Sequence, residues 1–391
     1  MKNLLNDYSR QDIFGFYKIG NFKTYSQIEA VEIHQRINLP IVWHFNDEVY
    51  GSFDWSKEPS ESISELYIKR CLQLREKYDY LVLFYSAGAD SDNIFNFFID
   101  NNIKLDEVVT LVDYESTQNK MSLINAEIFG VAIPKIELAK QKQPHLLHTV
   151  IDTRKIILDY YSRLNLDGIY EQNFSFAPLT IVRQKSKYSQ ENWNKMFSSG
   201  KKVGFIFGND KPKIEFDGRM NFISYFSSSG VAGATGPLSQ NINNEFEFTE
   251  LFYWSPDAPK IPIKQAHIIK NFVKQKTPKV FKKVPIYVNG VIRQPSAGAF
   301  TLVHDGNFLQ NEDLNRLIYP YWYNIPYQYR AVSLILMEKE SWFIDKMNTE
   351  LQAKNWKIIT KKVLEITNTD YRTQTFFNHA VHRSKNYNLG N

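Results

Sequence analysis

An unbroken apolar run that leads into a turn of small residues constrains this chain more than any other feature of its sequence. The run covers residues 80–85 and the turn covers residues 86–91. Apolar runs of this length are typical of strands that are buried on both faces of a parallel sheet. The sequence therefore predicts an α/β fold that is built around such a sheet.

A helix is predicted directly before this strand. Ser62 and Glu65 have the spacing of a capping box, and apolar residues follow them at helical spacing. We expect this helix to end near Lys77. Cys71 falls on its apolar stripe, so we interpret Cys71 as a buried structural thiol rather than as a nucleophile.

Helical and extended patterns continue to alternate after the turn. A short helix is expected from Ser91, a second buried strand over residues 108–112 and a later strand over residues 202–207. Between them, a helical pattern over residues 122–129 leads to a short apolar run at residues 131–133, which we interpret as a third strand. The alternation predicts a Rossmann-like, doubly wound and mainly parallel sheet.

The length of the chain predicts additions to this domain. A chain of 391 residues exceeds the size at which one hydrophobic core usually stops growing. We expect an N-terminal β-rich element over residues 1–55, the α/β domain over residues 56–275 and a C-terminal α+β extension over residues 276–391. The extension contains a helical pattern over residues 331–351.

The composition restricts the compartment and the partners. No stretch approaches the ~20 apolar residues that cross a bilayer, the first residues lack a secretion signal, and a single cysteine cannot form an internal disulfide. A cytoplasmic protein without membrane contact is expected. The formal charge of +5 is not gathered in one stripe, which argues against a nucleic-acid partner. The Asn, Lys, Ile, Phe and Tyr content favours an AT-rich genome, such as that of a phage.

The turn over residues 86–91 has the properties of an anion-binding loop. A strand that ends in a glycine-bearing turn and opens a helix directs backbone N–H groups and the positive helix end toward one point, which suits a phosphate group. Ser86 and Ser91 add hydroxyl donors. The turn has neither the adjacent Gly-Lys-Ser/Thr of a Walker A loop nor the three glycines of a dinucleotide-binding loop, so kinase and dehydrogenase functions are disfavoured.

The turn resembles the Ser-Gly-Gly-x-Asp-Ser signature of the PP-loop ATP pyrophosphatase superfamily, and the synthetase domain of asparagine synthetases is nearest in appearance. The six positions are occupied here by Ser86, Ala87, Gly88, Ala89, Asp90 and Ser91. The resemblance covers residues 78–135 well and residues 136–270 more loosely. It departs from the signature at the first glycine, where alanine would be strained by roughly 1 kcal/mol if φ is positive, and where a methyl group could hinder phosphate. A catalytically silent relative is therefore an alternative.

The resemblance implies roles for individual residues. The six residues of the loop would bind ATP, with Mg²⁺ on the pyrophosphate part, and Asp90 would be both catalytic and metal-placing. Asp113 follows the second strand, where such folds hold the nucleoside. The alternative, which we weight equally, is that Asp113 is an ordinary turn residue at the end of the strand.

A second loop is expected at the same edge of the sheet. Residues 208–212 follow the strand over residues 202–207 and contain Lys211. Members of the superfamily bring a lysine or arginine to the departing pyrophosphate, whose growing charge it neutralises. Lys211 is our choice as this catalytic residue, with Arg183 and Lys213 behind it. The alternative is a turn lysine in water.

Two further features are open to a functional interpretation. We expect a helix between Pro144 and Arg163, on which His145 and His148 would be spaced as metal ligands. Without a third ligand at a recognisable spacing, ordinary surface or core histidines are favoured. The aromatic segment over residues 252–257 could close over an acceptor substrate or form a packed seam between subdomains.

The resemblance implies an ATP-dependent adenylating ligase or amidotransferase-like enzyme. ATP would be cleaved to AMP and pyrophosphate while a carboxylate or amide oxygen is activated for a nitrogen nucleophile. A sulfur-transfer or adenylylsulfate-reductase-like enzyme is an alternative, but Cys71 precedes the loop on an apolar face. Lys2 stands where a glutamine-hydrolysing synthetase would have its cysteine, so we expect free ammonia, an amine-bearing substrate or a separate glutaminase partner as the nitrogen source.

Overall fold

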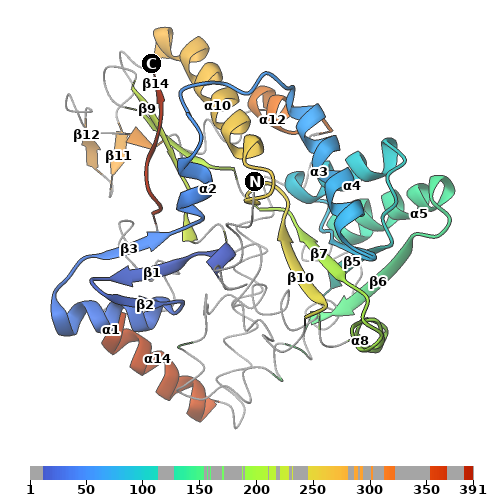
Figure 1. Ribbon diagram of the computed structural model, residues 1–391, viewed down its shortest axis with the longest axis horizontal. Coiled ribbons are helices and arrows are strands. Elements are labelled where there is room, and N and C mark those ends of the chain that lie inside the picture. Colours follow the sequence, from blue (N-terminus) through green and yellow to red (C-terminus); the bar gives the residue numbers. More distant parts are fainter. Residues whose placement is uncertain are drawn as a thin grey trace.

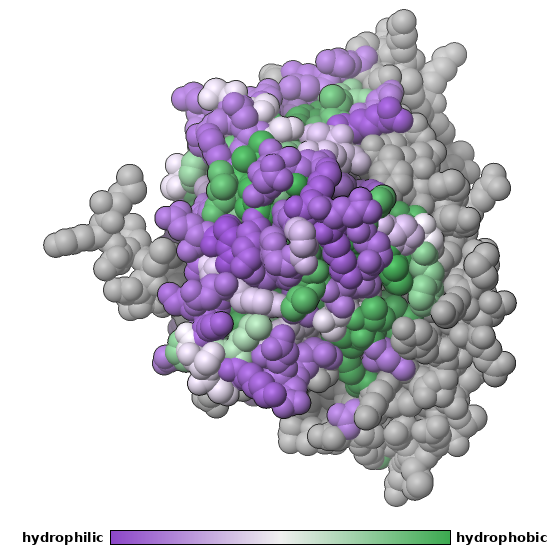
Figure 2. Space-filling view, turned by 90° about the vertical axis from the view of Figure 1, so that its right-hand side faces the viewer, coloured by the Kyte–Doolittle hydropathy of each residue, from purple (hydrophilic) through white to green (hydrophobic). Residues whose placement is uncertain are grey.

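The computed structural model describes the greater part of the chain, and all structural statements below concern those residues. They are 12–112, 127–153, 156, 159, 170, 187, 190–209, 211–216, 221–228, 231, 245–280, 286–288, 291–293, 301–302, 312–321, 353–367 and 383–390. Within these ranges, no helix has both the length and the apolar character needed to cross a membrane. Hydrophilic residues cover most of the described surface seen in Figure 2, and hydrophobic residues reach it only in patches.

A five-stranded sheet forms the centre of the fold, and all of its neighbouring strands are parallel. In spatial order the strands are β10 (Glu247–Leu251), β7 (Val203–Phe207), β4 (Tyr80–Phe84), β5 (Glu107–Val112) and β6 (Leu147–Asp152). Along the chain, β4 is the first strand of this sheet. Strands β5 and β6 are then added on one side of β4, and β7 and β10 on the other side (Figure 1). This is the doubly wound order of Rossmann-like folds, so the predicted α/β class is confirmed.

Helices flank this sheet. They are α3 (Ile63–Lys77), α4 (Ala89–Asp100), η3 (Ile128–Ala132), α5 (Ile133–Lys142), α8 (Glu191–Ser198) and α10 (Lys260–Val280). The predicted capping box of α3 is present, because Ser62 N–H donates to Glu65 Oε2 at 2.7 Å and Glu65 N–H donates to Ser62 Oγ at 3.2 Å. The cap fixes the start of α3 and so the direction in which the chain enters β4.

Strand β7 shows that both faces of the sheet are covered. Phe205 packs edge-on against Trp193 of α8, with ring centroids 5.1 Å apart. The preceding position along the strand points to the opposite face. There, a Cβ atom on Gly204 would lie 2.6 Å from the ring of Tyr78, the residue that directly follows α3. Helices α8 and α3 therefore cover opposite faces, and Gly204 leaves room for the close approach of Tyr78.

The third strand of the sheet is not where the sequence predicted it. Residues 131–133 lie in η3 and at the start of α5, and residues 147–152, which we expected in a helix, form β6. Pro134 is the second residue of α5, which continues the π-type turn η3 without a break. Thr149, Val150 and Ile151 are β-branched and pair with β5. The alternation of helices and strands was predicted correctly, but the third strand lies after α5, over residues 147–152, and not before it.

Smaller sheets adjoin the parallel sheet. The N-terminal sheet contains β1 (Phe16–Ile19), β2 (Phe22–Thr24) and β3 (Ile41–His44), and is accompanied by η1 (Asp12–Phe14), α1 (Gln27–Ile37) and α2 (Asp47–Gly51). A four-stranded antiparallel sheet contains β13 (Thr301–Leu302), β8 (Lys213–Phe216), β9 (Phe222–Tyr225) and β14 (Tyr387–Gly390). The remaining elements are β11 (Ile286–Val288), β12 (Val291–Arg293), α12 (Glu312–Ile318) and α14 (Ala353–Thr367). The antiparallel sheet joins strands from the predicted central and C-terminal units, whose boundaries remain predictions.

A buried aromatic seam joins the parallel sheet to the N-terminal sheet and to the four-stranded antiparallel sheet. Phe226, just after β9, packs against Phe45 and Tyr50 of the N-terminal part, with centroids 5.0 and 4.5 Å away. It also contacts Trp254, which follows β10, and Tyr387 of β14, with centroids 5.1 and 6.0 Å away. Trp254 is fully buried. The aromatic segment after β10 therefore forms a packed seam, which was one of its two predicted roles.

Cys71 provides a test of the predicted core. It is fully buried on α3, and this burial raises the pKa of its thiol well above the ordinary value, so the thiol stays protonated in the folded state. We expect no measurable reaction of the native protein with the thiol reagent DTNB, and one reactive thiol per chain in urea. Rapid reaction of the native protein would contradict this position for Cys71.

Candidate functional site

Two loops meet where the order of the parallel sheet reverses. Strand β4 runs into residues 86–91, and its neighbour β7 runs into Gly208 and Asn209 of the second predicted loop. Both loops leave the carboxyl ends of their strands, because the strands are parallel. Open α/β sheets bind ligands at this switch point, in the crevice beyond the strand ends. The two loops selected from the sequence are therefore adjacent, although more than a hundred residues separate them along the chain.

Direct contact between the loops is visible at Gly208. A Cβ atom on this glycine would lie 3.0 Å from Asp90 Cβ, and 3.2 Å from both the carbonyl carbon of Asp90 and the backbone nitrogen of Ser91. No larger residue fits here without movement of the first turn of α4 or of the loop after β7. Gly208 therefore allows the second loop to approach the first as closely as it does.

The first loop is held by hydrogen bonds between its own residues. Ser86 N–H donates to Ser91 Oγ at 3.2 Å, and Ser91 Oγ donates to Gly88 O at 3.2 Å. Gly88 N–H donates to Ser86 Oγ at 3.3 Å. Gly88 precedes α4 and has no side chain to cap the helix, so the positive end of α4 faces the loop. Ser86 is exposed at the mouth of the loop, whereas Ser91 is buried in its base.

Ala87 has the strained backbone that the missing glycine predicted. Its φ is +61°, in the left-handed region that costs a residue with a Cβ atom roughly 1 kcal/mol. The residue is fully buried and belongs to the hydrophobic core. Its methyl group therefore points into the core rather than over the exposed side of the loop. Hindrance of phosphate by this methyl group, which the sequence suggested, does not follow from this position.

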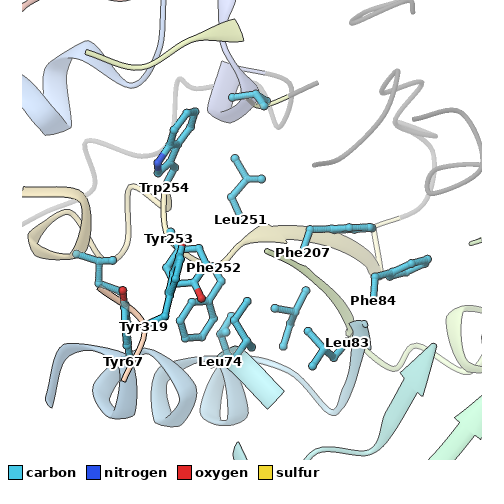
Figure 3. Close-up of a cluster of buried hydrophobic side chains, with 14 of the residues drawn as sticks. Tyr67, Leu74, Leu83, Phe84, Phe207, Leu251, Phe252, Tyr253, Trp254 and Tyr319 are labelled. Carbon is cyan, nitrogen blue, oxygen red and sulfur yellow. The ribbon is translucent and has the colours of Figure 1, made fainter. Parts of the chain in front are cut away.

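Asp90 is held from several sides. Its half-buried carboxylate accepts a short hydrogen bond on Oδ1 from the hydroxyl of Tyr319, and its backbone oxygen accepts one from Tyr253 Oη at 2.7 Å. Figure 3 shows Tyr253 and Tyr319 together beside Tyr67 at one end of the buried cluster. Burial, followed by the nearby Asp90 carboxylate, raises the pKa of Tyr319 well above its ordinary value, so its hydroxyl remains a donor.

The tyrosines around Asp90 were not identified from the sequence. Tyr253 follows β10 and Tyr319 follows α12, so both lie far from the loop along the chain. The aromatic density near each residue was visible, but nothing in the sequence indicated that their hydroxyls reach one carboxylate. Only the position of β10 in the sheet and the docking of α12 on α10 bring them there.

Asp92 is a second carboxylate in the first turn of α4, and its hydrogen-bond donors give it a structural role. It accepts hydrogen bonds from Tyr85 Oη at 2.7 Å, from Lys135 Nζ at 2.8 Å and from Asn96 Nδ2 at 2.9 Å. Its exposed fraction is 2%. A buried carboxylate needs this degree of pairing. Asp92 therefore anchors α4 to α5 and to Tyr85 at the end of β4, whereas Asp90 lies against Gly208 of the loop that follows β7.

Lys211 lies beside the residue that contacts Asp90. Its Nζ is 4.9 Å from the ring centroid of Tyr319, within the range of a cation–π interaction. The loop after β7 thus brings a cation to the same side chain that binds the loop after β4. Lys213, the reserve candidate, belongs to β8 of the antiparallel sheet. Asp113 and Arg183, the other predicted site residues, lie outside the described residues.

The two histidines considered as metal ligands are not arranged as a site. His148 lies on β6, and its Nε2 is 2.9 Å from Thr110 Oγ1 of β5. His145 lies before the strand rather than on a shared helix face. In the part of the chain that the structure describes, no three His, Cys, Asp or Glu side chains are grouped as metal ligands. Because His148 lies on a strand, the helical spacing that suggested the two histidines as metal ligands is not present.

Comparisons with known proteins gave no significant match to a protein-family model, a curated protein or a solved structure. The chain's own residues are therefore the basis for the proposed function.

The contact at Gly208 predicts a difference between two glycines. Gly208→Ala should lower the free energy of unfolding by about 1–3 kcal/mol, because the new methyl group overpacks the first turn of α4. Gly130→Ala is the control, since a Cβ atom there meets nothing within 4 Å and alanine favours helix by ~1 kcal/mol. Urea unfolding measures both. Equal stability of the two variants would show that the loops are not in close contact.

Proposed function

We propose that this chain is an ATP-using enzyme of the PP-loop pyrophosphatase type, which cleaves ATP to AMP and pyrophosphate while it activates a second substrate. The supporting observation is the contact between the loop over residues 86–91 and Gly208, which follows β7, at the switch point of the parallel sheet. The sequence of the first loop resembles the superfamily signature, and its position is that of a phosphate-binding loop.

The residues of the site suit a triphosphate. The positive end of α4 and the hydroxyl of Ser86 would bind pyrophosphate oxygens. Asp90 alone would repel them, so a cation between the two anions is required. A Mg²⁺ ion bound to substrate phosphates needs only one or two protein carboxylates, and it would neutralise the charge that gathers on the leaving pyrophosphate. Asp90 is the residue that would hold it.

Lys211 would act at the departing end of the pyrophosphate. Its position beside Tyr319 puts an ammonium group close to the residue that contacts Asp90. A fixed cation stabilises a transition state more than a ground state if negative charge grows there during the reaction. This is the role we assign to Lys211. Asp113 remains our candidate for nucleoside contact.

The second substrate would present a carboxylate or amide oxygen to the α-phosphorus, and a nitrogen nucleophile would then displace AMP. We propose free ammonia, an amine-bearing substrate or a separate glutaminase partner as the nitrogen source. Sulfur-transfer or reductase chemistry is less well supported, because the cysteine such reactions use would have to be Cys71, which is buried. The cytoplasm is the proposed compartment, which would be that of a host if the chain is phage-encoded.

A catalytically silent binding or assembly protein is the second candidate. The observation in its favour is the strained Ala87 in place of the glycine of the signature. Such a protein could still bind ATP but would release neither AMP nor pyrophosphate. Product analysis therefore distinguishes the two candidates.

The proposal predicts the products and the effect of loop variants. Incubation of radiolabelled ATP with a panel of metabolites should give substrate-dependent AMP and pyrophosphate. Asp90→Asn and Ser86→Ala should each lower kcat/KM by about two orders of magnitude, because preorganised charge and donor contacts are lost. Asp100→Asn, at the exposed end of the same helix, is the matched control and should keep full activity. ADP as the product, or unchanged activity of both loop variants, would reject the proposal.

Substitution of Lys211 should affect the chemical step of ATP cleavage more than the binding of ATP. Lys211→Ala should lower kcat by about one to two orders of magnitude and change ATP affinity by less than about threefold, because its charge is needed mainly as pyrophosphate leaves. Lys201→Ala, an exposed lysine before β7, is the control. Equilibrium binding of ATP and steady-state rates give the two quantities. Equal losses of affinity and rate would make Lys211 an anchor for ATP instead.

A further inference from the structure

Asp90 is held by residues from three separate segments. Tyr319, after α12, donates to Oδ1, and Tyr253, after β10, donates to the backbone oxygen. Gly208, after β7, packs against Cβ. Loops at the ends of strands are usually the adaptable parts of a fold. Here the first turn of α4 is restrained on its backbone and on its side chain.

Tyr319 differs from Tyr253 and Gly208 because it contacts the carboxylate group of Asp90 itself. Its ring is fully buried and lies 5.6 Å from the ring of Tyr253, measured between centroids. The same ring has the ammonium of Lys211 4.9 Å from its centroid. One side chain therefore contacts the proposed metal-placing residue through its hydroxyl and the proposed catalytic lysine through its ring.

We propose that Tyr319 is a positioning residue of the ATP site, which orients Asp90 toward a divalent cation and holds Lys211 beside the pyrophosphate. This inference rests on the proposed function of the loop. The segment over residues 312–321, which the sequence assigned only to an unexplained C-terminal extension, thereby completes the site.

The hydroxyl and the ring should have separable effects. Partners that hydrogen-bond to a metal ligand typically change metal affinity or activity by about 10–100-fold when they are removed. Tyr319→Phe removes the hydroxyl and keeps the ring. Tyr319→Leu removes both, so it should also impair the step that needs Lys211. We therefore expect Tyr319→Phe to change only the cation requirement, and Tyr319→Leu to change the reaction rate as well.

The neighbouring Tyr321 offers a matched control. It belongs to the same segment and packs against Phe97 of α4, with ring centroids 4.9 Å apart. Its hydroxyl is near Asp100, at the end of α4 away from the loop. Tyr321→Phe therefore removes a hydroxyl from the same segment and the same helix interface without a change at Asp90.

The experiment measures the Mg²⁺ concentration that gives half-maximal ATP cleavage, together with Mn²⁺ binding to the protein–ATP complex by electron paramagnetic resonance. Tyr319→Phe should raise the required Mg²⁺ concentration and weaken Mn²⁺ binding by about tenfold. Its kcat at saturating Mg²⁺ should stay within about threefold of wild type, as for Tyr321→Phe. Tyr319→Leu should in addition lower kcat, and Lys211→Ala should cause little further loss in that variant.

A double-mutant cycle excludes a merely structural role. In an Asp90→Asn background, Tyr319→Phe should no longer weaken Mn²⁺ binding, because the carboxylate that it orients is gone. The same tenfold effect in both backgrounds, or identical behaviour of Tyr319→Phe and Tyr321→Phe, would overturn the role of Tyr319 while leaving ATP cleavage by the wild type intact. Failure of the wild type to bind ATP with Mn²⁺ would instead overturn the proposed function and this inference together.

Discussion

The parallel pairing of β4 with β7 is the constraint on which the rest of the site depends. The two strands are far apart in the sequence, and their pairing puts both carboxyl ends at one point of the sheet. Phe84 and Phe207, the last residues of the two strands, stack there with ring centroids 4.5 Å apart, which holds the strand ends together. The next residue, Gly208, can then approach Asp90 without a side chain in between. The proposed phosphate site follows from this packing rather than from either loop alone.

The two carboxylates in the first turn of α4 show how the surroundings assign different tasks to similar residues. Both are favoured there by the helix dipole. Asp92 is paired with Lys135 and a tyrosine, and it is almost fully buried. Asp90 faces tyrosine hydroxyls and the loop of Lys211 instead. The partners of Asp92 hold the helix in place, whereas Asp90 contacts residues from the segments that form the proposed site.

Ala87 connects the stability of the fold with the proposed activity. Its left-handed backbone stores roughly 1 kcal/mol of strain, and its buried methyl group recovers a similar amount, since a buried methylene is worth about 0.8 kcal/mol. The exchange of glycine for alanine is thus tolerated in the core without a side chain on the open face of the loop. The departure from the signature is a local matter of stability, and it is compatible with either the active or the silent candidate.

The sequence by itself determined the α/β class, the start of α3, the central strands and the two loops, because these depend on local signals such as apolar runs, capping residues and glycine-bearing turns. It misjudged residues 131–133 and 147–152, where short apolar runs fit helix and strand equally well and pairing with β5 decided between them. The tertiary structure alone decided which side chains meet at Asp90. Tyr253, Tyr319 and Lys211 have no common sequence pattern, and only strand order and helix docking, which arise from long-range packing, bring them to one carboxylate.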